Sequence, residues 1–148
     1  MKYELTNETK TINRVTLHRI KALKSFSKVK EGDLGGWIER ESNLSHEGKS
    51  WVFGDALVYG DALVYGDAQV SGDAQVYGKA LVYGDAWVDG KSRVYGDARV
   101  SGNTRISGNT RVYGDAPTPN VTESECVSIG GKKYRLVEVK DWLSIKFR

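Results

Sequence analysis

Residues 51–116 read WVFGDA-LVYGDA-LVYGDA-QVSGDA-QVYGKA-LVYGDA-WVDGKS-RVYGDA-RVSGNT-RISGNT-RVYGDA, which is eleven consecutive units of six residues. Glycine occupies the fourth place of every unit without exception. Valine holds the second place in all units but one, where Ile106 replaces it, and a small Ala, Ser or Thr holds the sixth. Self-similarity at a short fixed period is the signature of a solenoid and outranks every local signal.

The alternation of side chains along a strand says which of these places lie inside. Ala56 and Val58 are two residues apart and point to one face, while Leu57 and Tyr59 point to the other. The Gly-Asp, Gly-Lys and Gly-Asn pairs that follow bend the chain, because glycine tolerates positive φ and Asp or Asn bonds the local backbone. One branched and one small inward side chain per unit fill a narrow interior. The sequence therefore predicts an all-β fold, a parallel β-solenoid over roughly residues 44–116, stabilised by stacked coils.

The repeat resembles that of the hexapeptide-repeat proteins, whose pattern of a branched aliphatic, three variable residues, a small residue and one more fits Val58–Leu63. The resemblance implies a left-handed, triangular parallel β-helix with three units, or about 18 residues, per coil. The chain also resembles short bacterial and bacteriophage proteins with the motifs K-Y-E-L-T at Lys2–Thr6, G-D-L-G-G-W-I-E at Gly32–Glu39 and N-L-S at Asn43–Ser45. That likeness implies a phage or prophage origin but no particular activity.

The flanks of the repeats divide the chain further. The sequence predicts four parts: an N-terminal β cap at 1–36 with strands near Lys2–Thr6 and Val15–Leu23, the β-helix at 37–116, a linker at 117–125 that follows two prolines, and a C-terminal tail at 126–148 made of a hairpin or three short strands. The glycines of Gly32–Gly36 are expected to form the turn into the helix. Their faint likeness to a phosphate-binding loop lacks the Lys-Ser/Thr ending.

Composition excludes several classes of protein. Of the 148 residues 39% are apolar and the mean hydropathy is −0.47, with no run of 18 apolar residues and no export signal, so we expect a cytoplasmic protein without a membrane anchor. Cys126 is the single cysteine, which leaves no intrachain disulfide. Residues 1–30 carry eight basic and two acidic groups, for +6, whereas residues 31–125 carry eight basic and fifteen acidic groups, for −7. Basic ends around an acidic middle make general nucleic-acid binding an unfavoured reading.

Catalytic residues are scarce in this sequence. Hexapeptide-repeat acyltransferases use a histidine as general base, but the only histidines here, His18 and His46, precede the uninterrupted repeats. Their position predicts structural roles in the cap, and two histidines cannot supply the three-histidine metal site of the carbonic anhydrase relatives. The sequence therefore predicts no catalytic residue, no metal and no cofactor, with an acyltransferase-like enzyme kept as the alternative.

The outward positions carry the functional hypothesis, because residues 18 apart stack about 4.8 Å apart in a three-unit coil. The candidate ligand-binding residues are Arg93, Arg111, Tyr95, Tyr113, Arg99 and Arg105. The candidate oligomer interface consists of Leu57, Tyr59, Leu63, Tyr65, Leu81 and Tyr83, which would otherwise be exposed apolar surface. Two plainer readings stay open: the tyrosines simply cover the solenoid, and the arginines pair with Asp97 and Asp115.

These residues together predict a non-catalytic, homotrimeric binding protein. Its partner would be an anionic small molecule, such as a nucleotide or phosphorylated metabolite, or a host protein that it inhibits. A purely structural or assembly role is the further alternative.

Overall fold

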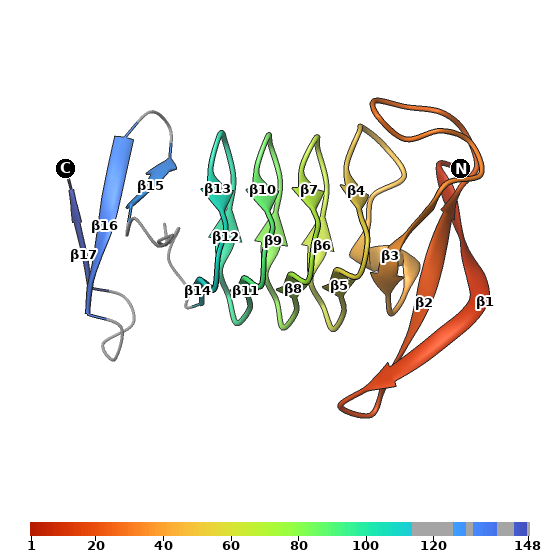
Figure 1. The fold of residues 1–148 in the computed structure, drawn as a ribbon, viewed down its shortest axis with the longest axis horizontal. Helices are drawn as coiled ribbons and strands as arrows, with labels where there is room; N and C mark the ends of the chain where they lie inside the picture. The colour runs from red at the N-terminus through yellow and green to blue at the C-terminus, as the bar shows by residue number, and fades with distance from the viewer. Residues whose placement is uncertain (114–125, 130–131, 139–143, 148) are drawn as a thin grey trace.

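The computed structural model describes residues 1–113, 126–129, 132–138 and 144–147, and their fold is a parallel β-solenoid with a β hairpin at its N-terminal end (Figure 1). Apart from one 3₁₀ turn, η1 (Glu41–Asn43), every element of the described residues is a strand. The strands before the repeats are β1 (Tyr3–Ile12), β2 (Val15–Ala22) and β3 (Leu34–Ile38). The repeat strands are β4 (Trp51–Val52), β5 (Leu57–Val58), β6 (Leu63–Val64), β7 (Gln69–Val70), β8 (Gln75–Val76), β9 (Leu81–Val82), β10 (Trp87–Val88), β11 (Arg93–Val94), β12 (Arg99–Val100), β13 (Arg105–Ile106) and β14 (Arg111–Val112).

Strand pairing confirms three units per coil. Each repeat strand pairs in parallel with the strand three units later, so that Leu57 lies opposite Gln75 and Val58 opposite Val76. This arrangement divides the repeats among three sheets, with the orders β3-β5-β8-β11-β14, β4-β7-β10-β13 and β6-β9-β12. Residues 18 apart are therefore neighbours on one face of the triangle, as the sequence predicted.

The interior is the narrow stack that the repeat predicted. Val58, Val76, Val94 and Val112 all have 0% exposure and lie in register one above the other. The small residues of the sixth place, such as Ala74 and Ala80, are equally buried. A solenoid interior of one valine and one alanine per unit leaves no room for a larger or charged side chain.

The corners of the triangle are formed by the glycine of each unit and the residue after it, and glycine is required where these corners stack. Every repeat glycine from Gly54 to Gly108 has φ between 61° and 72°, a region that other residues rarely adopt. At Gly78 an added Cβ would lie 2.8 Å from the backbone nitrogen of Gly96 in the next coil. The corners thus approach each other through their backbones, which the ladder of corner hydrogen bonds requires.

The N-terminal region is continuous with the solenoid. β1 and β2 form an antiparallel hairpin, β2 pairs with β3, and β3 pairs in parallel with β5, so one sheet runs β1-β2-β3-β5-β8-β11-β14. The expected first strand is confirmed but reaches Ile12 rather than Thr6. The expectation of a turn over Gly32–Gly36 is wrong from Leu34 onward, where β3 begins. Gly35 is needed for packing instead, because a Cβ there would lie 2.6 Å from the carbonyl oxygen of Val52.

The C-terminal tail contains the strands that the sequence predicted. β15 (Cys126–Ile129), β16 (Lys132–Glu138) and β17 (Ser144–Phe147) form an antiparallel three-stranded sheet in the order β15-β16-β17. The predicted linker at 117–125 and the turn at Gly130-Gly131 lie outside the described residues.

Candidate anion-binding face

A ladder of tyrosines follows one face of the solenoid. Tyr59, Tyr77, Tyr95 and Tyr113 follow β5, β8, β11 and β14, with successive ring centroids 5.0, 5.1 and 5.0 Å apart and interplanar angles of 5°, 5° and 11°. The spacing is that of the parallel strands beneath them, so the rings stack because the repeat places them in register. The ladder that the sequence predicted is confirmed.

Two arginines stand beside this ladder. Arg93 and Arg111 are direct neighbours in the pairing of β11 with β14, and both are exposed. Neither forms an ion pair with a carboxylate within the described residues. Burial raises the pKa of Tyr95, as do its neighbours Tyr77 and Tyr113, whereas the positive charges of Arg111 and Arg93 act to lower it. The arginines are therefore close enough for their charges to act on the tyrosine ladder.

The other two candidate arginines lie on different faces. Arg99 on β12 continues the column of Leu63 and Leu81 on the β6-β9-β12 sheet. Arg105 on β13 pairs with Asp89 at 3.1 Å and lies 5.1 Å from the ring of Trp87. The six predicted ligand residues therefore do not converge on one place, and Arg93, Arg111, Tyr95 and Tyr113 form the single coherent group among them. We call these four residues the Arg–Tyr face.

The hairpin covers the N-terminal end of the same sheet. Leu17 packs with Trp37, Leu57 and Tyr59, and the hairpin residues Ile12 and Val15 pack against this cluster together with Tyr77. Leu57 is only 4% exposed and Tyr59 only 9%. The chain itself thus covers both, which corrects the expectation that they lie open on the surface. Sequence reasoning missed this because nothing local shows where a hairpin folds.

The remaining predicted interface residues have no such cover. Leu63, Tyr65, Leu81 and Tyr83 are half-buried on the β6-β9-β12 sheet. The rings of Tyr65 and Tyr83 stack at 4.8 Å. These four side chains give this face an apolar outer surface.

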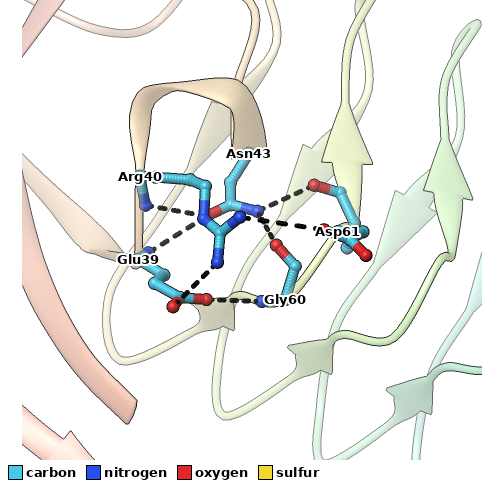
Figure 2. A network of polar contacts seen from close by, with 6 residues as sticks. Glu39, Arg40, Asn43, Gly60 and Asp61 are labelled. Carbon is cyan, nitrogen blue, oxygen red and sulfur yellow. Dashed lines mark hydrogen bonds and ion pairs between the residues drawn. The ribbon is translucent and has the colours of Figure 1, made fainter.

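A buried asparagine joins the cap to the first coil (Figure 2). The side-chain oxygen of Asn43 accepts hydrogen bonds from the backbone N–H groups of Glu39 and Arg40, at 3.1 and 2.9 Å. Its amide nitrogen donates to the carbonyl oxygens of Gly60 and Ala62, at 3.1 and 2.8 Å. The side chain is completely buried and uses all four of its hydrogen-bonding positions. This residue gives a structural reason for the N-L-S motif.

Three charged side chains, Glu39, Arg40 and Asp61, interact at the same corner. The carboxylate of Glu39 accepts from the backbone N–H of Gly60 at 2.8 Å and pairs with Arg40 at 3.0 Å, and Arg40 also approaches Asp61 at 3.7 Å (Figure 2). Desolvation acts to raise the pKa of Glu39, but the hydrogen bonds from Arg40 and Gly60 outweigh it and hold that pKa below its usual value. The corner is therefore a structural joint whose charges are already paired.

The Lys2 side chain is buried at the N-terminal end of the solenoid. Its ammonium group donates to the carbonyl oxygen of Ser50 at 2.7 Å and to the hydroxyl of Ser50 at 3.2 Å, and the side chain lies over the Phe26 ring. Burial lowers the pKa of Lys2 to about 8, helped by the nearby charge of Lys24 and opposed by Asp67. Lys2 therefore resides in a site that disfavours its charged form.

Both histidines take part in contacts of the cap. His46 stacks on Tyr3 with ring centroids 4.1 Å apart, accepts a hydrogen bond at Nδ1 from the backbone N–H of Lys2, and contacts Glu41 through Nε2. The Nδ1 of His18 lies 3.3 Å from the carbonyl oxygen of Thr6 on the neighbouring strand. Neither ring lies on the repeat faces, and the described residues hold no group of three or more His, Cys, Asp or Glu side chains suited to a metal ion.

The repeats match a known solenoid family. The YdcK β-solenoid repeat matches residues 56–72, 68–84, 74–90 and 92–108. The chain is also 37% identical over 60 residues to a protein of Escherichia coli K12 described as "Uncharacterized acetyltransferase YdcK". That alignment covers 35% of this chain but only 18% of the length of the relative.

These matches, with the three-unit coil, define a hexapeptide-repeat-like left-handed β-helix, as the sequence predicted. No helix within the described ranges has the length and apolarity needed to cross a membrane.

Proposed function

We propose that the protein is a non-catalytic binding protein that holds an anionic small molecule on the Arg–Tyr face. The observation that carries the proposal is the pairing of Arg93 with Arg111 on neighbouring strands. Like charges directly opposite each other in a sheet are destabilising. In one column of corners Lys79 stands between Asp61 and Asp97, whereas other columns stack like charges, as Asp67 on Asp85. An anion between the two guanidinium groups relieves the repulsion here.

The chemistry of this face suits phosphate. A guanidinium group presents a fork of N–H donors that binds a phosphate oxygen pair in two parallel hydrogen bonds. The phenol hydroxyl of Tyr95 follows the same strands and offers a neutral donor beside the two charges. A nucleotide or a phosphorylated metabolite is therefore the expected class of ligand.

Isothermal titration calorimetry with orthophosphate, pyrophosphate and a panel of nucleotides tests this proposal. The Arg93→Gln/Arg111→Gln variant should lose at least about tenfold in affinity, since hydrogen bonds to charged groups contribute about 1.5–3 kcal/mol each. Arg99→Gln is the matched control, because it removes an exposed arginine from another face. Equal losses in both variants, or no heat from any anion with the wild type, would overturn the proposal.

The second candidate function is acetyl transfer, which the name of the E. coli relative favours. Against it stand the cap contacts of His18 and His46, which leave no histidine on the repeat faces to act as a general base. Release of coenzyme A from acetyl-CoA, measured with a panel of amine and hydroxyl acceptors, distinguishes the two functions. Turnover that His46→Gln abolishes would establish the enzyme and displace the binding protein.

A homotrimer remains part of the proposal. Leu63, Tyr65, Leu81 and Tyr83 form the apolar face that the hairpin leaves uncovered, and such a face favours contact with another chain. Light scattering coupled to gel filtration should give three times the 16.4 kDa of one chain, and a mass of one chain would remove this part. A bacteriophage origin, inhibition of a host protein and a purely structural role stay predictions without a supporting contact.

A further inference from the structure

The turn between β1 and β2 has an unusual backbone for its residues. Asn13 and Arg14 have φ values of 50° and 69°, so both lie in the left-handed region, as a tight two-residue hairpin turn requires. Asparagine is common there, but the second position favours glycine, and an arginine is strained in it. Arg14 is also exposed, so packing does not explain its presence. Strain of this kind in an exposed residue is a reason to look for a function.

This turn lies beside the tyrosine ladder. Ile12 and Val15, which flank the turn on either side, pack against the cluster that contains Tyr59, and Tyr77 packs against the same cluster. Figure 1 agrees, since it shows the β1–β2 turn level with β5, on the side of the solenoid where β5 and β8 lie. The hairpin tip therefore stands at the N-terminal end of the face on which Arg93 and Arg111 lie.

The pKa of Tyr59 responds both to the hairpin turn and to Arg93. Burial and the neighbouring Tyr77 raise its pKa, whereas a hydrogen bond from Asn13 and the charge of Arg93 act in the opposite direction. The hairpin tip thus lies at Tyr59, and Arg93 lies two coils further along the same tyrosine ladder. Arg14, like Arg93, has no carboxylate ion pair within the described residues.

We infer that Arg14 is a third cationic residue of the Arg–Tyr face and that the ligand is a linear oligophosphate lying along the tyrosine ladder. This inference rests on the proposed function and adds to it the length and direction of the ligand. Arg93 and Arg111 lie one coil apart, and the ladder rises 5.0–5.1 Å per coil, so the cations form a row parallel to the solenoid axis. A single phosphate reaches two neighbouring arginines, whereas a chain of phosphates reaches the hairpin tip as well.

Calorimetry with orthophosphate and tripolyphosphate on the wild type and on Arg14→Gly tests the inference. Glycine suits the positive φ of position 14, so the variant keeps the turn while it removes the charge. The wild type should bind tripolyphosphate more tightly than orthophosphate. Arg14→Gly should lose about tenfold for tripolyphosphate and nothing for orthophosphate, because only the longer anion reaches the tip.

Lys28→Gln is the matched control. Lys28 is an exposed cation of the cap in the segment between Phe26 and Val29, and Phe26 packs on Trp51 rather than on the ladder. Its removal should leave both affinities unchanged. A melting temperature of Arg14→Gly at or above that of the wild type confirms that the turn is intact. ATP in place of tripolyphosphate shows whether the source is a free oligophosphate or a nucleotide, since a base that adds affinity identifies the latter.

The outcomes separate this inference from the proposed function. If Arg14→Gly and the wild type bind tripolyphosphate equally, while Arg93→Gln/Arg111→Gln does not bind it, the inference is wrong and the proposed function stands. If no phosphate species binds the wild type, both are wrong. If Lys28→Gln loses as much as Arg14→Gly, the binding reflects net charge, and the role of Arg14 is overturned.

Discussion

At a regular corner and at the first corner of the solenoid, equivalent carbonyl oxygens of the next coil accept hydrogen bonds from different donors. At a regular corner the backbone N–H groups of Asp61 and Leu63 donate to the carbonyl oxygens of Gly78 and Ala80, at 2.8 and 3.0 Å. At the first corner, one coil earlier, the amide group of Asn43 donates to both Gly60 and Ala62. The repeats distribute their stability over many equivalent bonds, whereas the cap concentrates it in single side chains.

The difference arises from the 3₁₀ turn η1 and not from the register. Ile38 and Leu44 both pair with residues 20 positions later, so the corner that holds Asn43 has as many residues as a regular one. Because η1 turns the backbone N–H of Asn43 toward Arg40, a side chain has to supply the donors that the regular corner takes from its backbone. The following predictions test this difference between repeats and cap with variants, from the largest expected change in stability to the smallest.

The largest effect is expected inside the repeats. Val76→Asp places a carboxylate in the completely buried stack, where it has no partner, and should destabilise the protein by more than about 4 kcal/mol or prevent folding. The neighbouring Gln75→Asp, on the outward side of the same strand, should cost less than about 1 kcal/mol. Chemical denaturation followed by circular dichroism measures both. Equal stability of the two variants would contradict the inward and outward assignment.

The next effect belongs to the first corner. Asn43→Ala removes four hydrogen bonds and leaves the carbonyl groups of Gly60 and Ala62 unpaired, which should cost about 3 kcal/mol. Asn103→Ala, at an exposed regular corner, should cost less than about 0.5 kcal/mol. If the two asparagines proved equally dispensable, the cap would not depend on a single side chain. Thermal denaturation of both variants decides the matter.

A smaller effect concerns Lys2, whose burial makes the free energy of unfolding depend on pH. The pKa of Lys2 is about 8 in the folded protein and 10.5 in an ordinary environment, so the unfolded chain binds more protons between these pH values. Stability therefore rises with pH in this window, because the folded state no longer has to bury a charge. Relative to Lys2→Met, the wild type should gain about 1–2 kcal/mol between pH 7.5 and 9.5 in urea denaturation. Parallel curves for the two proteins would show that Lys2 is not desolvated.

The sequence predicted those parts of the fold in which the determinants are local. Ala56, Val58 and Gly60 recur every six residues, and their alternation alone fixes which side faces inward. The Arg93–Arg111 pair and the tyrosine ladder followed from the same period. Asn43 and the hairpin were beyond that reasoning, because their partners lie far away in the sequence and outside the six-residue pattern. A tertiary contact such as that of Ile12 with the cluster around Leu57 leaves no periodic trace in a sequence.

The smallest expected effect compares two arginines within the repeats, and its sign is more informative than its size. Arg93 faces Arg111 across neighbouring strands, whereas Arg105 pairs with Asp89. Removing Arg93 relieves a repulsion, so Arg93→Gln should stabilise the ligand-free protein by about 0.2–0.5 kcal/mol at low salt.

Arg105→Gln should instead be neutral or destabilise the protein by a similar amount, because it breaks an exposed ion pair. Both effects should fade as added salt shortens the range of the charges to a few ångströms. Melting temperatures at low and at 1 M sodium chloride measure the difference. Tripolyphosphate should reverse the order, because a bound anion stabilises the wild type and not Arg93→Gln. If Arg93→Gln destabilises the protein without any anion, Arg93 serves the fold, and the repulsion that motivates the binding site does not exist.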